Sequence, residues 1–216
     1  MEKKKEAGKR NKGNYSLYQK FLISDGSQKL QKEFLMCWKY LKESKIYFLI
    51  VLGIFIFSVI LGMFFPVFLV DYITELVKKL AEETSGLNFL QLFFFILKNN
   101  LVTAFFGLIF GIVFGLFPVS LAFLNGYVLG FISGKVANIA GFSSLIRLLP
   151  HGVFEIPALV LSLGLGLKLG MFLFVKNKRK QLKYDLENSL RVFLFVIIPL
   201  LLIAGVIETG LIFLFG

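Results

Sequence analysis

Residues 46–70 form an apolar run of 25 residues without one charged side chain. A helix needs roughly 20 such residues to cross the hydrocarbon core of a bilayer, so this run predicts a membrane-spanning helix. The composition agrees, because 57% of the residues are apolar and 17% are charged. Ordinary soluble domains have roughly half and about a quarter, respectively. Such a chain has too little polar surface to cover a globule in water, and we therefore expect an integral membrane protein.

We predict four further spans, over residues 101–117, 119–133, 152–175 and 192–215, with Pro118 marking the turn between the second and the third. Residues 87–97 are apolar but too short to span, so they are expected at the membrane interface. Residues 135–150 have a mixed character, which predicts an interfacial or partly re-entrant connection. The expected fold is all-α: one multi-pass transmembrane helical bundle of about five spans, covering residues 46–216.

The first 45 residues are polar and basic, with 12 Lys or Arg against 5 Asp or Glu. Residues 1–28 have no sustained periodicity and are predicted to form a basic flexible tail. In residues 29–45, apolar side chains recur at helical spacing between lysines: Leu30, Phe34, Cys37, Trp38 and Leu41. This pattern predicts an N-terminal amphipathic helix on the membrane surface, with Trp38 at the depth of the headgroups. The alternative is a soluble helix packed against its own chain.

The distribution of charge predicts the orientation, because basic loops stay on the cytoplasmic side of a membrane. The N-terminal segment has a net charge of +7. Residues 176–191 carry six basic and two acidic side chains, whereas residues 71–98 carry three basic and four acidic ones. Five spans put both basic segments on one side, which predicts a cytoplasmic N-terminus and an outside C-terminus in the cell membrane. Four spans would separate the two basic segments, so that arrangement is disfavoured.

Glycines recur every four residues in the second and third predicted spans. Residues four apart share a helix face, and glycine there lets two helix backbones approach closely. Two such stripes on consecutive antiparallel helices predict a tight hairpin, although a contact between copies of the chain would fit as well. The glycines are Gly107, Gly111 and Gly115 in the first stripe, and Gly126, Gly130 and Gly134 in the second.

Several polar side chains fall at the predicted depth of the membrane, where an isolated charge costs a few kcal/mol. Glu155 and Glu208 lie in the outer halves of the fourth and fifth spans, so they can share one polar pocket. His151 lies four residues before Glu155 on the same helix face, and Pro150 suits the start of that helix. The predicted pocket consists of Asn99, Asn100, Asn125, His151, Glu155 and Glu208.

Three kinds of chemistry are open to this pocket. Its side chains can be structural hydrogen-bond partners, with one carboxylate kept protonated by burial. They can form a proton relay in a transporter, since histidine titrates near neutral pH. Metal binding and catalysis have less support, because one histidine is few for zinc, no HExxH motif occurs, no Ser–His–Asp geometry is indicated and Cys37 is the only cysteine. We therefore predict no catalytic residue, no metal site and no cofactor.

The basic segments could attract nucleic acid or anionic lipid. No nucleic-acid motif or aromatic interleaving accompanies the charges, and a multi-span topology favours lipid headgroups. We expect anionic headgroups of the bilayer to contact the N-terminal segment and residues 176–191, and we expect no nucleic-acid partner. Membrane protein partners or a homo-oligomer are also expected. Lys168 is predicted only to extend toward the basic cluster that follows it.

Two motifs carry a family resemblance. Asn125 and Gly126 form an Asn-Gly pair within LKNNLVTAFFGLIFGIVFGLFPVSLAFLNGYVLG, and residues 150–158 form a PHGxxExPA element. Together they resemble the stage II sporulation protein M family over about residues 91–170. The stretch IAGVIETG around Glu208 is similar to the C-terminal helix of that family. The resemblance implies a multi-pass integral membrane protein.

The same resemblance implies a class of function. In spore-forming bacteria, the founding member is implied to join a membrane complex with peptidoglycan-degrading partners during engulfment. The family extends to archaea and to bacteria that do not sporulate, so sporulation is not transferred to this chain. The leading expectation is a non-catalytic membrane scaffold or complex subunit. The second is a small transporter or permease that uses the polar pocket.

Overall fold

The computed structural model describes residues 27–67, 70–113, 115–141, 143 and 149–215, and every regular element among them is a helix. Residues 27–43 form an N-terminal helix, which we name the amphipathic helix. The tail predicted for residues 1–28 lies outside the described residues except for its last two, which begin this helix. The elements that follow are α2 (Lys45–Phe64), α3 (Val70–Thr84), α4 (Phe89–Ile109), α5 (Leu116–Ala140), α6 (Leu149–Gly170), α7 (Lys178–Val192) and α8 (Ile198–Phe215).

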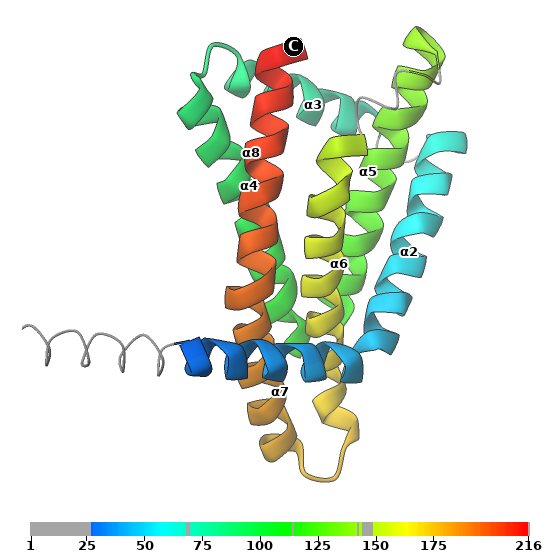
Figure 1. The fold of residues 1–216 in the computed structure, drawn as a ribbon. Helices are drawn as coiled ribbons and strands as arrows, with labels where there is room; N and C mark the ends of the chain where they lie inside the picture. The colour runs from blue at the N-terminus through cyan, green and yellow to red at the C-terminus, as the bar shows by residue number, and fades with distance from the viewer. Residues whose placement is uncertain (1–26, 68–69, 114, 142, 144–148, 216) are drawn as a thin grey trace, which may run out of the picture.

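Five helical stretches are long and apolar enough to cross a membrane, which confirms the predicted all-α bundle of about five spans. The stretches are Lys45–Phe64, Phe89–Ile112, Leu116–Ile139, Gly152–Phe174 and Lys178–Leu214. They lie alongside one another and alternate in direction (Figure 1). The stretch in α6 is the central one. In its most apolar 18 residues, 61% are buried inside the protein, whereas the corresponding share in the other four stretches is 22–33%. The outer helices expose leucine, isoleucine and phenylalanine side chains, which lipid tails can cover as well as protein does.

The second span begins earlier than predicted. Asn88 caps α4, because its side chain accepts from the backbone N–H of Gln91 at 3.0 Å and the Gln91 side chain accepts from the Asn88 N–H at 3.0 Å. This reciprocal pair satisfies two of the backbone donors that the first turn of a helix leaves unpaired. Residues 87–97, predicted as a separate interfacial segment, therefore contribute the cap and first turns of one continuous helix.

The turn between α4 and α5 lies at Gly115 and not at Pro118. Gly115 has φ of +67°, a left-handed backbone conformation that glycine adopts without the steric cost of a Cβ. Pro118 lies in the first turn of α5, where its missing N–H has no helical acceptor to lose. The third span is also longer than the predicted residues 119–133, because α5 takes in the first part of the connection predicted for residues 135–150.

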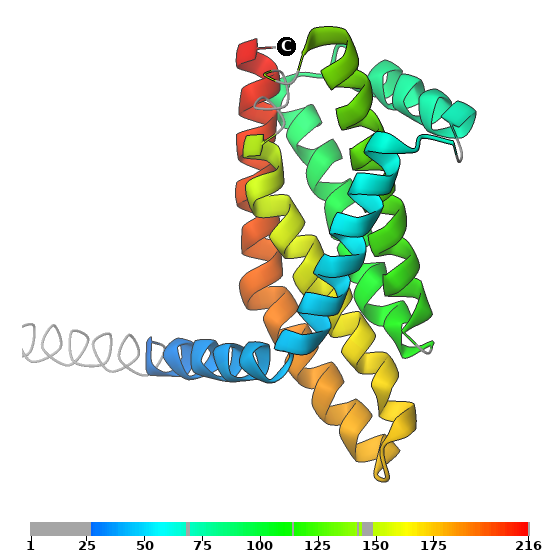
Figure 2. The same cartoon turned by 90° about the vertical axis from the view of Figure 1, so that its right-hand side faces the viewer.

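The fifth span is the upper part of a longer helical column. α7 leads through a π-helical turn, Phe193–Ile197, directly into α8 (Figure 2). The wider turn precedes Pro199, which lacks an N–H and whose ring would crowd the carbonyl four residues earlier in a regular helix. The predicted span over residues 192–215 corresponds to the apolar part of this column. The basic residues of the segment 176–191 thus lie largely on α7, below that apolar part.

The two glycine stripes make close helix approaches, but not with each other. A Cβ at Gly111 would overlap the carbonyl oxygen of Gly166 in α6, and a Cβ at Gly130 would overlap that of Val59 in α2. The first stripe therefore faces α6, and the second stripe, in α5, faces α2. This corrects the predicted tight hairpin between the second and third spans. Spacing in the sequence identifies the narrow face of a helix, but not which helix packs against it.

Two helices run across the direction of the spans (Figures 1 and 2). The amphipathic helix does so beside α7 and projects from the side of the bundle in Figure 2, and α3 does so at the end of the bundle where the C-terminus lies. Arg191 of α7 pairs with Glu33 of the amphipathic helix, so the two basic segments lie at the same end of the bundle. That placement is the one that five spans require, while the cytoplasmic orientation of this end stays a prediction.

Candidate functional site

Four of the six predicted pocket residues line one cavity of about 320 Å³. Asn99 and Asn100 come from α4, Glu155 comes from α6 and Glu208 comes from α8. Residues of α3 form part of its wall, which places the cavity at the end of the bundle that α3 crosses. These wall residues are Leu80, Ala81 and Thr84.

Asn125 lines a second and much smaller cavity together with Asn100 and Glu155. The side-chain amide of Asn125 donates to the carbonyl oxygen of Leu121 at 2.8 Å, one turn earlier in α5. Asn100 and Glu155 border both cavities. Polar side chains from α4, α5 and α6 therefore extend from the larger cavity to the smaller one. The backbone of His151 belongs to α6, but its side chain lies outside the described part of the structure.

The larger cavity has the chemistry of a site for protons, cations or hydrogen-bond donors. Glu155 and Glu208 are half-buried, and the Oε2 atom of each is shielded from solvent. Two carboxyl groups that border one cavity can together bind a cation or accept hydrogen bonds from a donor. Among the described residues, no group of three or more His, Cys, Asp or Glu side chains is placed to hold a metal ion.

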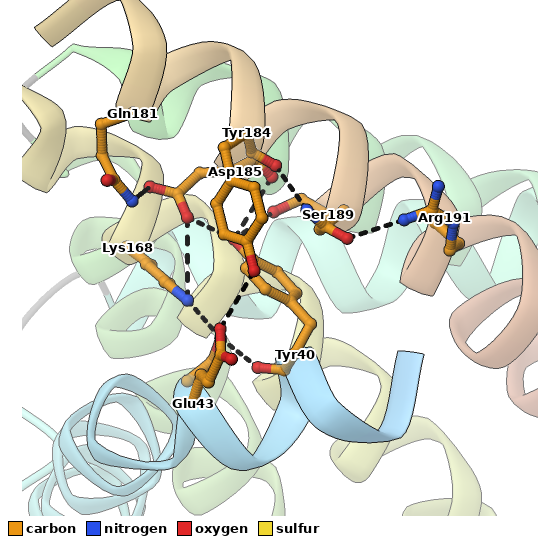
Figure 3. A network of polar contacts seen from close by, with 10 residues as sticks. Tyr40, Glu43, Lys168, Gln181, Tyr184, Asp185, Ser189 and Arg191 are labelled. Carbon is orange, nitrogen blue, oxygen red and sulfur yellow. Dashed lines mark hydrogen bonds and ion pairs between the residues drawn. The ribbon is translucent and has the colours of Figure 1, made fainter. Parts of the chain in front are cut away.

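A second polar site lies at the opposite end, where the amphipathic helix meets α6 and α7 (Figure 3). Lys168 of α6 is 9% exposed, and Asp185 of α7 is 2% exposed. The Lys168 Nζ lies 3.7 Å from the Asp185 Oδ1 and donates to the Ser44 hydroxyl at 3.0 Å. The same ammonium lies 3.8 Å from the centre of the Tyr40 ring, close enough for a cation–π contact. Three separate parts of the chain therefore meet at one buried cation.

Both oxygens of the buried carboxylate also accept hydrogen bonds. The Tyr40 hydroxyl donates to the Asp185 Oδ1 at 3.0 Å and lies 3.2 Å from the hydroxyl of Ser189. The Gln181 amide donates to the other oxygen, Oδ2, at 2.8 Å. A buried charge is tolerated when it is both paired and hydrogen-bonded, and both conditions hold for Asp185. We name Tyr40, Ser44, Lys168, Asp185 and Ser189 the buried network.

More exposed contacts and a buried thiol flank this network. Arg191 pairs with Glu33, and the Tyr184 hydroxyl donates to the Glu43 carboxylate at 3.2 Å. Burial raises the pKa of the Tyr40 hydroxyl above its ordinary value. Burial also raises the pKa of the Cys37 thiol, and the nearby Arg191 charge opposes that rise. Cys37 is 2% exposed, so its thiol is shielded for as long as the amphipathic helix stays docked.

The buried network was not predicted from the sequence. Lys168 was expected only to extend toward the basic cluster, whereas the structure pairs that lysine with Asp185 inside the protein. One signal was available, because Lys168 is the only charged residue between positions 156 and 175 and a lone buried charge needs a partner. Tyr40 was out of reach of such reasoning, since 145 positions separate it from Asp185.

The family model described as stage II sporulation protein M matches residues 48–211 of this chain. The chain belongs to the stage II sporulation protein M family. The matched range contains the four predicted residues that line the larger cavity, as well as Lys168 and Asp185, but it begins after the amphipathic helix. In this family member, the buried network thus joins the matched domain to a helix that precedes it.

One relative gives a more limited comparison. An uncharacterized protein of Methanocaldococcus jannaschii is 35% identical over 118 residues, which cover 51% of this chain and 51% of the relative. The chain therefore spans about half the length of the curated relative that it matches. No solved structure matches the chain.

Proposed function

We propose that this member of the stage II sporulation protein M family acts as a non-catalytic membrane scaffold or complex subunit. The observation that supports this most is the attachment of the amphipathic helix. Its buried face is held by side chains from two other helices, so the helix presents its remaining surface in a defined position. A fixed surface of this kind suits the recruitment of other membrane proteins, which in a spore-forming host would be proteins of cell-wall remodelling.

The partners would engage the basic end of the bundle or the acidic α3 at the other end. Lys176, Lys178 and Lys180 are exposed at the basic end, whereas Glu75, Glu82 and Glu83 are exposed on α3. Both surfaces have the charge that complementary partners recognise, and electrostatic complementarity contributes to specificity more than to raw affinity. A second copy of the chain is a partner of the same kind.

Affinity purification from native membranes, followed by mass spectrometry, tests the scaffold. We expect defined membrane partners to co-purify with the wild-type chain, and fewer of them with a variant in which Lys176, Lys178 and Lys180 are changed to Gln. A variant with Lys98→Gln and Lys135→Gln is the matched control for lost positive charge, because both lysines are exposed and lie outside the two proposed surfaces. Recovery of the chain by itself in every preparation would contradict the proposal, as would turnover that His151→Ala abolishes.

A small transporter is the second candidate, and the cavity bordered by Glu155 and Glu208 favours it. Two carboxyl groups from different helices can pass a proton or cation between them if the helices shift. Glu155→Gln and Glu208→Gln remove the charge but keep nearly the same shape. In a reconstituted transporter, each change should abolish proton or cation flux, whereas Glu83→Gln on exposed α3 should leave it unchanged. Flux at background in the wild-type chain excludes this candidate.

A further inference from the structure

The amphipathic helix has two apolar surfaces. One surface is buried against the bundle and carries Cys37 and Tyr40, which are 2% and 1% exposed. The other is a stripe of Leu30, Phe34 and Trp38, which are 52%, 52% and 60% exposed. Residues four apart share a helix face, so these three side chains form one continuous apolar line. We name this line the exposed stripe.

The exposed stripe lies on the side of the amphipathic helix that is nearer to the membrane-spanning helices. Glu33 and Phe34 are consecutive residues, but they contact different turns of the same helical column. Glu33 pairs with Arg191, whereas the Phe34 ring packs against the ring of Phe195 at a centroid distance of 5.9 Å. Phe195 is one turn closer to the apolar span of α8. The polar edge of the amphipathic helix therefore faces α7, and the exposed stripe lies on the side of the bilayer.

A lipid leaflet fits the exposed stripe better than a protein partner does. The stripe is continuous with the lipid-facing surface of the fifth span through Phe195, beside which Leu194 is 59% exposed. Exposed lysines flank the stripe, and the Lys42 Nζ lies 5.1 Å from the centre of the Trp38 ring. A helix with an aromatic apolar face and lysines on its polar face is suited to an interface with anionic headgroups.

The buried network determines how the amphipathic helix is turned. Tyr40 lies on its buried surface and Ser44 directly follows its last residue; they hold Asp185 and Lys168, which belong to two other helices. A buried ion pair contributes little net stability, but removing one partner leaves an uncompensated charge and is strongly unfavourable. Such a pair therefore restricts which arrangements of the three helices are permitted.

We propose that Tyr40, Lys168 and Asp185 form a lock that holds the amphipathic helix with its exposed stripe in the adjacent lipid leaflet, with anionic headgroups against its lysines. The proposal goes beyond the scaffold, because it names lipid as the occupant of this surface and identifies the residues that orient it. It does not depend on whether protein partners bind elsewhere.

Cys37 is the only cysteine and reports on the lock from the buried surface. In the purified full chain, we expect N-ethylmaleimide to label Cys37 roughly tenfold or more faster in Asp185→Asn than in wild type, because Lys168 loses its counter-charge. The double variant Lys168→Met with Asp185→Asn has no uncompensated charge and should label more slowly than Asp185→Asn. Lys183→Met is the control, since Lys183 forms an exposed pair with Glu187 on the same helix.

Equal labelling of Cys37 in wild type and Asp185→Asn overturns the lock, and so does a double variant as reactive as the single one. Circular dichroism and elution volume identify a variant that has lost its fold. In that case Tyr40→Phe takes its place, because it keeps the ring and removes only the hydroxyl that Asp185 accepts from. We expect a smaller rise in labelling for Tyr40→Phe, and no rise would overturn the lock.

Trp38 is the only tryptophan and reports on the exposed stripe. We reconstitute the wild-type chain at low density in vesicles of brominated phosphatidylcholine, with and without phosphatidylglycerol. Lipid contact predicts strong quenching of Trp38 emission relative to unbrominated vesicles, and stronger quenching when phosphatidylglycerol is present. Unquenched emission overturns the lipid assignment and leaves a protein or a second copy as the occupant. Quenching that ignores phosphatidylglycerol overturns the role of anionic headgroups.

Discussion

At the scale of single residues, glycines set the distance between helices, because they have no side chain to hold the backbones apart. Gly126 and Gly130 of α5 lie against the backbone and side chains of α2, where even one methyl group would overlap a carbonyl oxygen. In lipid the hydrophobic effect does not draw helices together, so close packing of this kind carries much of their association. Gly53 on α2 is different, because nothing lies within 4 Å of the position that its Cβ would take.

This difference predicts the effect of two chemically identical substitutions. Gly130→Ala should lower the free energy of unfolding by about 1–3 kcal/mol, because α2 and α5 must move apart to admit the methyl group. Gly53→Ala should stay within about 1 kcal/mol of wild type, since alanine favours a helix and meets no neighbour there. Denaturant titration of both variants in the same detergent measures the two values. Equal effects would mean that the close approach does not contribute to stability.

At the scale of elements, the amphipathic helix has polar as well as apolar partners in the bundle. Tyr40 supplies both a ring under the Lys168 ammonium and a hydroxyl to the Asp185 carboxylate. Burial raises the pKa of Tyr40, so the docked state favours the protonated hydroxyl. The corresponding stability is fully present below the ordinary tyrosine pKa of about 10 and is lost as the pH rises above it.

Absorbance of tyrosinate tests this pH dependence. The chain has 7 tyrosines, and Tyr40→Phe has one fewer to ionise. Below the pH at which the helix is released, wild type and Tyr40→Phe should give the same tyrosinate absorbance, because Tyr40 stays protonated. In denaturant, where the helix is released, Tyr40→Phe should instead give less tyrosinate absorbance than wild type near the ordinary tyrosine midpoint of about pH 10. The same difference without denaturant would show that the docked hydroxyl ionises normally.

At the scale of the whole molecule, five alternating spans place two distant basic segments at one end and the acidic α3 at the other. α6 lies in the middle and takes part in both polar sites, through Glu155 near one end and Lys168 near the other. Basic loops remain cytoplasmic during insertion, so the end with the amphipathic helix is expected inside the cell.

Cysteine labelling in intact cells tests that orientation. In a Cys37→Ser background, Ser85→Cys lies in the turn between α3 and α4, and Lys176→Cys lies in the turn before α7. An impermeant maleimide should label Ser85→Cys from outside, and Lys176→Cys only after lysis. The reverse result would invert the orientation, and labelling of both from outside would contradict five spans.

The part of the site that could be predicted is the part that follows from the order of the spans or from local spacing in the sequence. Glu155 and Glu208 were placed together because topology alone puts both in the same half of the bundle, and both line one cavity with Asn99 and Asn100. The start of α4 was also within reach, because the Asn88 and Gln91 spacing is a local helix signal. The partners of the glycine stripes were not, since a stripe looks the same whichever helix packs on it.

By itself, the sequence determined the membrane class, the all-α fold, the number of spans and the family, because these depend on the length and apolar character of continuous segments. Only the tertiary structure decided that α6 is central, that the stripes face α6 and α2, and that Lys168 is paired inside the protein. The reason is that segment hydrophobicity is a sum over neighbouring residues. The pairing of Tyr40, Lys168 and Asp185 instead depends on how three helices are rotated about their axes, and no single segment records that rotation.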